Sequence, residues 1–262
     1  MTALPRVEGL LLDMDGVIMM SWRALPGAVE ALARLRAAGL PLRLLTNTTE
    51  KTGAEMAAEL RRIGFDVTAA EVLTAAAAAA DYLRAEHPGA RVFLLGDGRP
   101  ADLEGVELVG LDEAPDVILL SGADPSFTFA TINRVYRALL GGAALVAMHR
   151  NLSWMTGEGV CLDAGAYLYG LERALGREAV VAGKPSAAAF DAGLRALGVP
   201  ASAALMVGDD LENDVLAAQA VGITGVLVRT GKFREELLAG APGTPDHVID
   251  SIADLPGLLG LE

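Results

Sequence analysis

Short apolar runs alternate with helix-like patterns in the first part of the chain. An apolar run of about four to eight residues bounded by turn residues is typical of a buried strand, whereas apolar residues three and four positions apart indicate a helix. Strand patterns cover residues 9–13 and 40–45, and helix patterns cover residues 26–38 and 51–63. This alternation predicts an α/β fold, in which a parallel sheet is covered by helices on both faces.

The middle of the chain has a separate series of strand and helix patterns. An unbroken alanine run at residues 75–80 begins a predicted helix. Strand patterns follow at 92–95, 117–120 and 144–147, a helix pattern at 126–140, a glycine-rich stretch at 156–165 and a helix pattern at 166–175. The strand–helix alternation of the first part of the chain returns near residue 180, with strands predicted at 204–208 and 225–228 and an edge strand at 248–249. We therefore expect a core domain of residues 1–74 and 180–262, and an inserted α/β domain of residues 75–179.

Composition narrows the expected partners. The formal net charge of −13 would repel nucleic acid and anionic membranes, but it would favour a divalent cation. Apolar runs fall short of the ~18 residues that a membrane span needs, and the first residues lack the pattern of a signal peptide. One cysteine cannot form an internal disulfide, and the three histidines form no cluster with zinc spacing. We expect a cytoplasmic protein with no nucleic-acid or membrane partner.

Polar side chains follow or interrupt the apolar runs at four places. Asp13 and Asp15 end the first strand, and on a strand they would project to the same side, about 6–7 Å apart. Two like charges this close are costly unless a cation or a proton lies between them, so we expect Mg²⁺ there. The other three places are Thr46 with Asn47, Lys184, and Asp209 with Asp210 and Asp214.

Each of these groups has an ordinary explanation when taken alone. Paired aspartates before a glycine often form a turn, Thr46 and Asn47 fit a helix N-cap, and acids such as Asp209 favour a helix N-terminus. Lys184 could be a solvated surface lysine. However, ligands of open parallel α/β sheets bind outside the carboxyl ends of the strands. Four polar groups at such positions therefore favour one shared functional site.

Taken in order, these residues resemble the four motifs of the haloacid dehalogenase superfamily of phosphohydrolases. The matching segments are Asp13-x-Asp15, Thr46-Asn47, Gly183-Lys184-Pro185 and Gly208-Asp209-Asp210-x-x-x-Asp214. The insert between the second and third motifs resembles the C2-type cap of the class IIA, NagD-like phosphatases. Residues 43–49, 207–215 and 227–233 look closest to the group around the phospholysine phosphohistidine inorganic pyrophosphate phosphatase. The resemblance implies a Rossmann-like core with the inserted domain as its cap.

The resemblance also implies a role for each site residue. Asp13 would be the nucleophile that forms an aspartyl-phosphate, and Asp15 would protonate the leaving oxygen and then activate water. Mg²⁺ would be held by the carboxylate of Asp13, the main-chain carbonyl of Asp15 and Asp209. The remaining roles would be charge neutralisation by Lys184, hydrogen bonds from Thr46 and Asn47 to the phosphoryl oxygens, and support of the metal ligands by Asp214 and Asp210.

The expected activity is Mg²⁺-dependent hydrolysis of a small phosphorylated metabolite, and other activities stay open. A phosphotransferase or mutase would share the aspartyl-phosphate chemistry, and a non-catalytic phosphoacceptor or binding module would share the acidic pocket. The cap would exclude water and select the leaving group, with Asp97, Asp124 and residues 149–151 as candidates. A homodimer formed through the cap is a further expectation from the resemblance.

Overall fold

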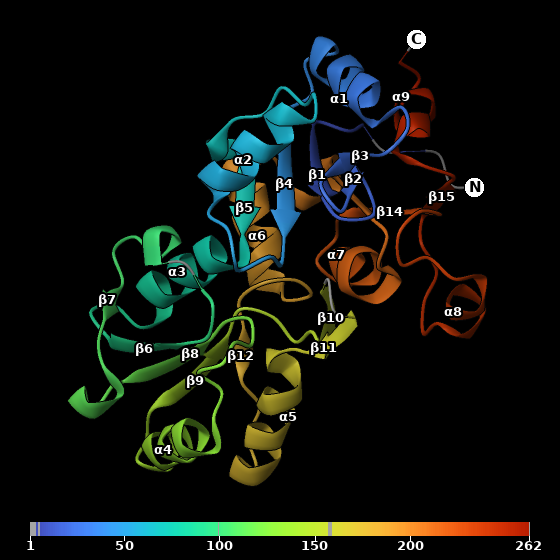
Figure 1. Ribbon diagram of the computed structural model, residues 1–262. Helices are drawn as coiled ribbons and strands as arrows, with labels where there is room; N and C mark the ends of the chain where they lie inside the picture. The colour runs from blue at the N-terminus through green and yellow to red at the C-terminus, as the bar shows by residue number, and fades with distance from the viewer. Residues whose placement is uncertain (1–3, 5, 99, 157–158, 262) are drawn as a thin grey trace. The chain divides into compact units, whose positions relative to one another are not determined.

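The chain divides into two compact units (Figure 1). The computed structural model describes residues 4, 6–98, 100–156 and 159–261. The first unit comprises Met1–Thr46, Gly53–Leu73 and Lys184–Glu262, and the second comprises Asn47–Thr52 and Thr74–Gly183. Residues 47–52, 74 and 180–183 thus belong to the second unit, although the sequence pattern assigned them to the core.

A strand pairing explains the position of residues 180–183. Strand β12 (Val180–Val181) pairs in parallel with β9 (Ala144–Ala147) of the second unit. The sequence shows only that this segment is apolar, and an apolar run this short fits either sheet. The chain therefore returns to the first unit at Lys184.

The first unit is built on a six-stranded sheet in the order β15-β14-β13-β1-β4-β5, in which the pairs from β15 to β4 are parallel. Its strands are β1 (Gly9–Asp13), β4 (Leu42–Thr46), β5 (Val72–Thr74), β13 (Ala204–Gly208), β14 (Thr224–Val228) and β15 (His247–Ile249). A short antiparallel hairpin of β2 (Met19–Met20) and β3 (Arg23–Ala24) follows β1. The predicted parallel sheet and its edge strand are confirmed.

Helices pack on both faces of this sheet because successive side chains of a strand point to opposite sides. They are α1 (Ala28–Ala37), α2 (Gly53–Arg62), α6 (Ala187–Leu197), α7 (Ala217–Ala220), α8 (Glu235–Gly240) and α9 (Leu255–Leu258). Leu10 and Leu12 of β1 pack in one cluster with residues of α1 and α2, whereas Leu11 packs in another with residues of α6 and α7. Each of these leucines is fully buried and stabilises the fold by about 1.5–3 kcal/mol. Strand β1 is therefore held rigidly from both sides.

The second unit contains a five-stranded parallel sheet in the order β12-β9-β8-β6-β7. Its remaining elements include β6 (Arg91–Leu95), β7 (Glu107–Leu108), β8 (Val117–Leu120), α3 (Ala75–Glu86), α4 (Phe129–Leu140) and α5 (Ala164–Leu175). The buried alanines of α3 pack on one face of the sheet, and α4 and α5 pack on the other. The prediction of a second α/β unit with a closely packed alanine-rich helix is confirmed.

Some local features of the second unit differ from the sequence pattern. Helix α4 begins three residues later than predicted, because the side chain of Thr128 accepts a hydrogen bond from the main-chain N of Thr131 and caps the helix there. Part of the glycine-rich stretch forms an antiparallel hairpin of β10 (Ser153–Thr156) and β11 (Gly159–Leu162), and residues 157–158 lie outside the described residues.

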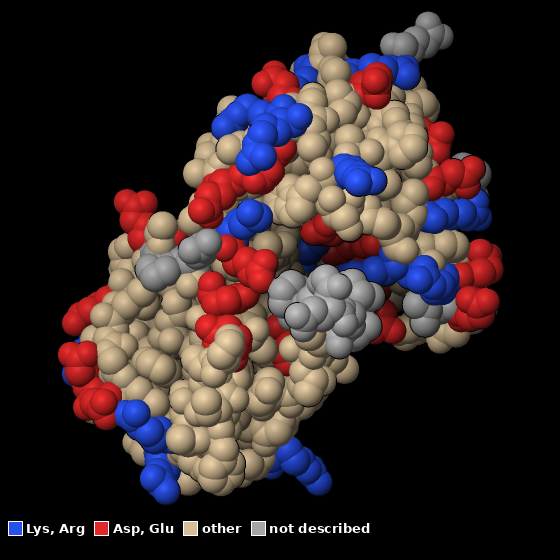
Figure 2. Space-filling view, in the orientation of Figure 1, with Lys and Arg blue, Asp and Glu red and all other residues tan. Residues whose placement is uncertain are grey.

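The surface carries charges of both signs. On the face shown in Figure 2, Lys and Arg side chains are interspersed with Asp and Glu. Helices long and apolar enough to cross a membrane are absent from the described part of the chain.

Candidate active site

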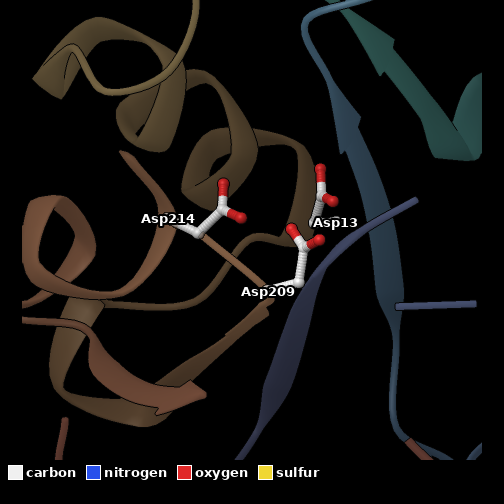
Figure 3. Close-up of side chains that lie close together, drawn as sticks. All are labelled: Asp13, Asp209 and Asp214. Atoms are coloured by element: carbon white, nitrogen blue, oxygen red, sulfur yellow. The ribbon is translucent and has the colours of Figure 1, made fainter. Parts of the chain in front are cut away.

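Three buried carboxylates meet at the carboxyl edge of the first unit's sheet (Figure 3). Asp13 is the last residue of β1, and Asp209 directly follows β13. These strands are parallel neighbours in which Leu12 lies opposite Val207, so their ends lie side by side. Asp214 comes from a π-helical segment, Leu211–Leu216, that follows β13. One carboxylate oxygen of each aspartate lies within 4.8 Å of the other two.

Lys184 supplies a positive charge to this cluster. Its ammonium group forms ion pairs with Oδ1 of Asp13 and, at 2.7 Å, with Oδ1 of Asp214. The residue is only 4 % exposed. Burial alone would lower the pKa of Lys184, but the carboxylates of Asp13 and Asp214 outweigh burial and raise this pKa above its usual value. Lys184 is therefore positively charged at any ordinary pH.

One lysine does not offset three buried carboxylates. Burial, together with repulsion from Asp13, raises the pKa of Asp209 to about 7. Burial also raises the pKa of Asp214 to about 6, because it outweighs the attraction of Lys184. Both shifts have the same physical meaning: the cluster holds more negative charge than its surroundings neutralise.

The donor set fits a divalent cation that prefers oxygen ligands. Oδ1 of Asp209 is buried and makes no hydrogen bond with any described residue. A buried carboxylate oxygen without a partner loses its solvation, and a bound cation would restore it. Asp13 and Asp209 offer hard oxygen donors of the kind that Mg²⁺ and Ca²⁺ bind. The structure thus places a cluster of three carboxylates at the end of β1 and after β13.

Asp15 and Gly16 form a tight turn after β1. The main-chain N of Gly16 donates a hydrogen bond to the carbonyl of Met19 at 2.7 Å, and Gly16 has a φ of +86°. A left-handed φ of this kind favours glycine. The side chain of Asp15 is exposed overall, but partial burial of its carboxyl raises the pKa of Asp15, and the ammonium groups of Lys232 and Lys184 oppose the shift.

Asp210 lies outside the three-carboxylate cluster and caps the segment that follows. Its side chain accepts hydrogen bonds from the main-chain N of Asn213 at 3.0 Å and from the Asn213 amide at 2.9 Å, and it pairs with Lys232 at 3.2 Å. Burial raises the pKa of Asp210, but these partners outweigh it and the net shift is downward. The ordinary explanation of acids here, helix capping, therefore applies to Asp210.

The two polar residues at the carboxyl end of β4 belong to different units. Thr46 is the last residue of β4 and is buried. Since Asp13 lies opposite Leu45 in the sheet, Thr46 comes one residue further along at the same edge. Asn47 belongs to the second unit, where its side chain lies close to Gly183. A Cβ added at Gly183 would lie 2.8 Å from Oδ1 of Asn47.

Sequence reasoning gave no role to the turn after β14. The hydroxyl of Thr230 donates a hydrogen bond to the carbonyl of Gly16. The main-chain N of Lys232 donates one to Oδ2 of Asp209 at 2.8 Å. One sequence feature could have pointed to this turn: it follows another predicted strand of the same parallel sheet, and ligands bind at the carboxyl ends of such strands.

The second unit gathers polar groups at the ends of its own strands. Asp97 follows β6, accepts a hydrogen bond from the Thr49 side chain and has a pKa raised by burial. Nε2 of His149, which follows β9, lies 3.9 Å from Oδ2 of Asp163. Burial lowers the pKa of His149, although Asp163 and Asp97 oppose the shift. Asp163 was not predicted as part of such a group.

The other candidates in the second unit have local structural roles. Oδ1 of Asp124 accepts a hydrogen bond from the main-chain N of Ser126 at 2.8 Å, within its own turn. Arg150 donates two hydrogen bonds to the carboxylate of Glu172, at 2.8 and 2.7 Å. The main-chain N of Asn151 donates to Nδ1 of His149 at 3.3 Å. These contacts organise loops of the second unit.

The fold and the site define an α/β enzyme with an acidic centre, which contains one buried lysine, at the edge of a parallel sheet. A family model described as haloacid dehalogenase-like hydrolase matches residues 10–112, and a second HAD-like hydrolase model matches residues 181–255. The human phospholysine phosphohistidine inorganic pyrophosphate phosphatase is 35 % identical over 260 residues, which cover 97 % of this chain and 94 % of that protein.

Two solved structures extend the comparison. NagD from Escherichia coli K-12 has a TM-score of 0.86 and 29 % identity, with 95 % of this chain and 98 % of that chain covered. A glycerol phosphate phosphatase from Mycobacterium tuberculosis, solved in complex with magnesium, has a TM-score of 0.86 and 27 % identity, with 95 % of this chain and 76 % of that chain covered. The chain belongs to the haloacid dehalogenase-like hydrolases, and within them to the NagD-like class IIA phosphatases.

Proposed function

We propose that Asp13 is the nucleophile of a Mg²⁺-dependent phosphatase whose substrate is a small phosphorylated metabolite. The observation that carries this proposal is the buried pairing of Asp13 with Lys184 beside the unpartnered oxygen of Asp209. A carboxylate is a weak nucleophile toward a phosphate dianion, because the two negative charges repel. A centre that gathers positive charge around one strand-end aspartate removes that obstacle.

The first step would be an in-line attack of the Asp13 carboxylate on phosphorus. A bond forms between a carboxylate oxygen and phosphorus while the bond from phosphorus to the leaving oxygen breaks. Lys184 would stabilise both the nucleophile and the equatorial phosphoryl oxygens as a compact point charge. Thr46 and Asn47 would donate hydrogen bonds to those oxygens. Water then attacks the aspartyl-phosphate, releases phosphate and regenerates the carboxylate.

Asp15 would carry the protons of both steps. Its raised pKa increases the protonated fraction, so that Asp15 can donate a proton to the leaving oxygen. The resulting carboxylate then accepts a proton from the attacking water, which returns Asp15 to its starting state. The exposure of its side chain leaves it accessible to substrate and water.

The metal would be held by the carboxylates of Asp13 and Asp209 and by the main-chain carbonyl of Asp15. Asp214 would orient Lys184 behind these ligands, and Asp210 would fix the following helix. When bound, Mg²⁺ supplies charge neutralisation for the phosphoryl transfer. A relative solved with magnesium and the oxygen-only donor set support Mg²⁺ as the ion.

The two units would have different functions, catalysis in one and substrate selection in the other. We propose the unit of residues 1–46, 53–73 and 184–262 as the catalytic core, and the unit of residues 47–52 and 74–183 as the cap. The cap would select the leaving group, and its half-buried Asp97 and buried His149 and Asp163 are candidates for that task. The name of the human relative makes pyrophosphate and phosphoamino compounds the first substrates to try. Cytoplasmic location, a homodimer through the cap and the absence of nucleic-acid and membrane partners stay predictions.

Phosphate release from p-nitrophenyl phosphate tests the proposal. We expect turnover with Mg²⁺, loss of turnover with EDTA and loss of turnover in Asp13→Asn with Mg²⁺. Asp66→Asn, at an exposed position of the same unit, is the matched control and should retain wild-type turnover. Appreciable Mg²⁺-dependent activity in Asp13→Asn would refute the assignment. A panel of phosphorylated metabolites, pyrophosphate and phosphoamino compounds would then define the substrate class.

A further inference from the structure

The turn Thr230–Lys232, which follows β14, ties together two parts of the site that come from distant positions in the chain. The Thr230 hydroxyl binds the carbonyl of Gly16, in the turn after Asp13 and Asp15. The main-chain N of Lys232 binds Oδ2 of Asp209 at 2.8 Å. One three-residue turn therefore contacts both segments that carry the proposed metal ligands.

Two glycines bring the backbone against the Asp209 carboxylate. Gly16 and Gly231 have φ values of +86° and +61°. A Cβ at Gly16 would lie 2.0 Å from Oδ2 of Asp209, and a Cβ at Gly231 would lie 1.9 Å from the same atom. The Cβ at Gly231 would also lie 2.7 Å from the Cα of Gly16. Because ordinary van der Waals contacts of a Cβ are longer than about 3.4 Å, a side chain at either position would displace the carboxylate.

The two oxygens of Asp209 are left in different states by these contacts. Oδ2 is enclosed by the two glycines and accepts the Lys232 N–H. Oδ1 is buried and makes no hydrogen bond in the part of the chain that the structure describes. A carboxylate held by one oxygen presents the other to a cation as a single ligand. Mg²⁺ requires near-octahedral geometry at short distances, whereas Ca²⁺ accepts more ligands and two-oxygen coordination by one carboxylate.

We propose that the Thr230–Lys232 turn is a positioning element of the metal site, which fixes Asp209 so that only Oδ1 coordinates the ion and thereby favours Mg²⁺ over Ca²⁺. The inference rests on the proposed function, since it assumes that Asp209 is a metal ligand. The turn acts through its main chain and Gly231. The Lys232 ammonium group pairs with Asp210, and its positive charge opposes a second cation nearby.

Calorimetric titration of Mg²⁺ and of Ca²⁺ into the metal-free full chain tests this proposal without an activity assay. Gly231→Ala should weaken Mg²⁺ binding by about 10–100-fold, the range typical of residues that orient a metal ligand, and should reduce the preference for Mg²⁺ over Ca²⁺. Thr230→Val should weaken Mg²⁺ binding less. Lys232→Ala keeps the main-chain N–H and removes a positive charge, so its Mg²⁺ affinity should equal or exceed that of the wild type.

Gly198→Ala is the matched control for left-handed backbone strain. Gly198 lies in the same unit with a φ of +74°, and a Cβ there would meet nothing within 4 Å. Its Mg²⁺ affinity should be that of the wild type. A folded Gly231→Ala with wild-type Mg²⁺ affinity and selectivity would overturn the proposal. If Gly231→Ala does not fold, wild-type affinity in Thr230→Val would overturn it. A wild-type chain that binds no Mg²⁺ would instead refute the proposed function.

Discussion

The ammonium group of Lys184 is ion-paired with the carboxylate of Asp13, 171 residues away in the sequence, and both residues are buried. The pair joins β1 to the segment at which the chain returns to the first unit. Because little of either side chain is exposed to solvent, each charge depends on the other. The consequences of removing one partner should therefore differ from those of removing both.

Lys184→Met should destabilise the metal-free protein as well as inactivate the enzyme. Loss of the ammonium leaves Asp13 and Asp214 buried without their shared partner, which typically costs about 3–5 kcal/mol of unfolding free energy. The double variant Lys184→Met with Asp13→Asn should regain part of that loss, because one uncompensated charge is gone. Urea unfolding in EDTA at neutral pH measures the unfolding free energies of the single and the double variant. Equal losses in the single and double variants would contradict the argument.

The metal-free protein should lose stability as the pH rises from about 4 to about 8. Asp209 has a pKa near 7 and Asp214 has a pKa near 6, whereas the ordinary value is 3.8. Both carboxyl groups therefore bind protons more tightly in the folded protein than in the unfolded protein. Their stabilising contribution is therefore full below the unfolded pKa and is lost as the pH rises through the folded pKa.

Thermal unfolding across this pH range, with EDTA and then with Mg²⁺, measures the effect. Asp209→Asn in EDTA should show a flatter dependence, because one of the two groups no longer titrates. Added Mg²⁺ should restore the melting temperature of the wild type at high pH. If the melting temperatures of the wild type and of Asp209→Asn in EDTA changed with pH in parallel, Asp209 would have no raised pKa.

Mg²⁺ binding should release protons near neutral pH. A cation competes with the proton on Asp209, so affinity should rise with pH until the carboxylate is ionised in the free protein. We expect close to one proton released per Mg²⁺ at about pH 6 and almost none at about pH 9. Calorimetry in two buffers with different ionisation enthalpies counts these protons. Proton release that does not change over this range would place the titrating group elsewhere.

The sequence predicted the elements whose periodicity is strong and the site residues that end strands. Asp13 and Asp209 were predictable because a buried parallel strand rarely ends in acids, and parallel strands bring their carboxyl ends to one edge. The sequence could not separate Asp214, which joins the carboxylate cluster, from Asp210, which caps a helix. Both are acids near one helix start, and only the π-helical turn decides which one points inward.

Other features depend on contacts that leave little trace in a sequence. The main-chain N of Lys232 holds Asp209 regardless of its side chain, so the residue type carries no signal. Residues 180–183 could join either sheet, since a short apolar run matches both, and their pairing with β9 places them in the second unit. Residue patterns therefore predicted the ends of the first unit's strands better than the loops between them.

Asp15→Asn should separate the two chemical steps. The leaving group of p-nitrophenyl phosphate is a weak base and needs no proton, so attack by Asp13 should still form the aspartyl-phosphate. Its hydrolysis needs a base to activate water, and an amide cannot accept that proton. Turnover should fall by about 10²–10⁴-fold, and acid-quenched protein should carry a phosphoryl group detectable by mass spectrometry. The double variant with Asp13→Asn should carry none. Wild-type turnover in Asp15→Asn, with no phosphoryl group trapped, would assign the proton transfers to another residue.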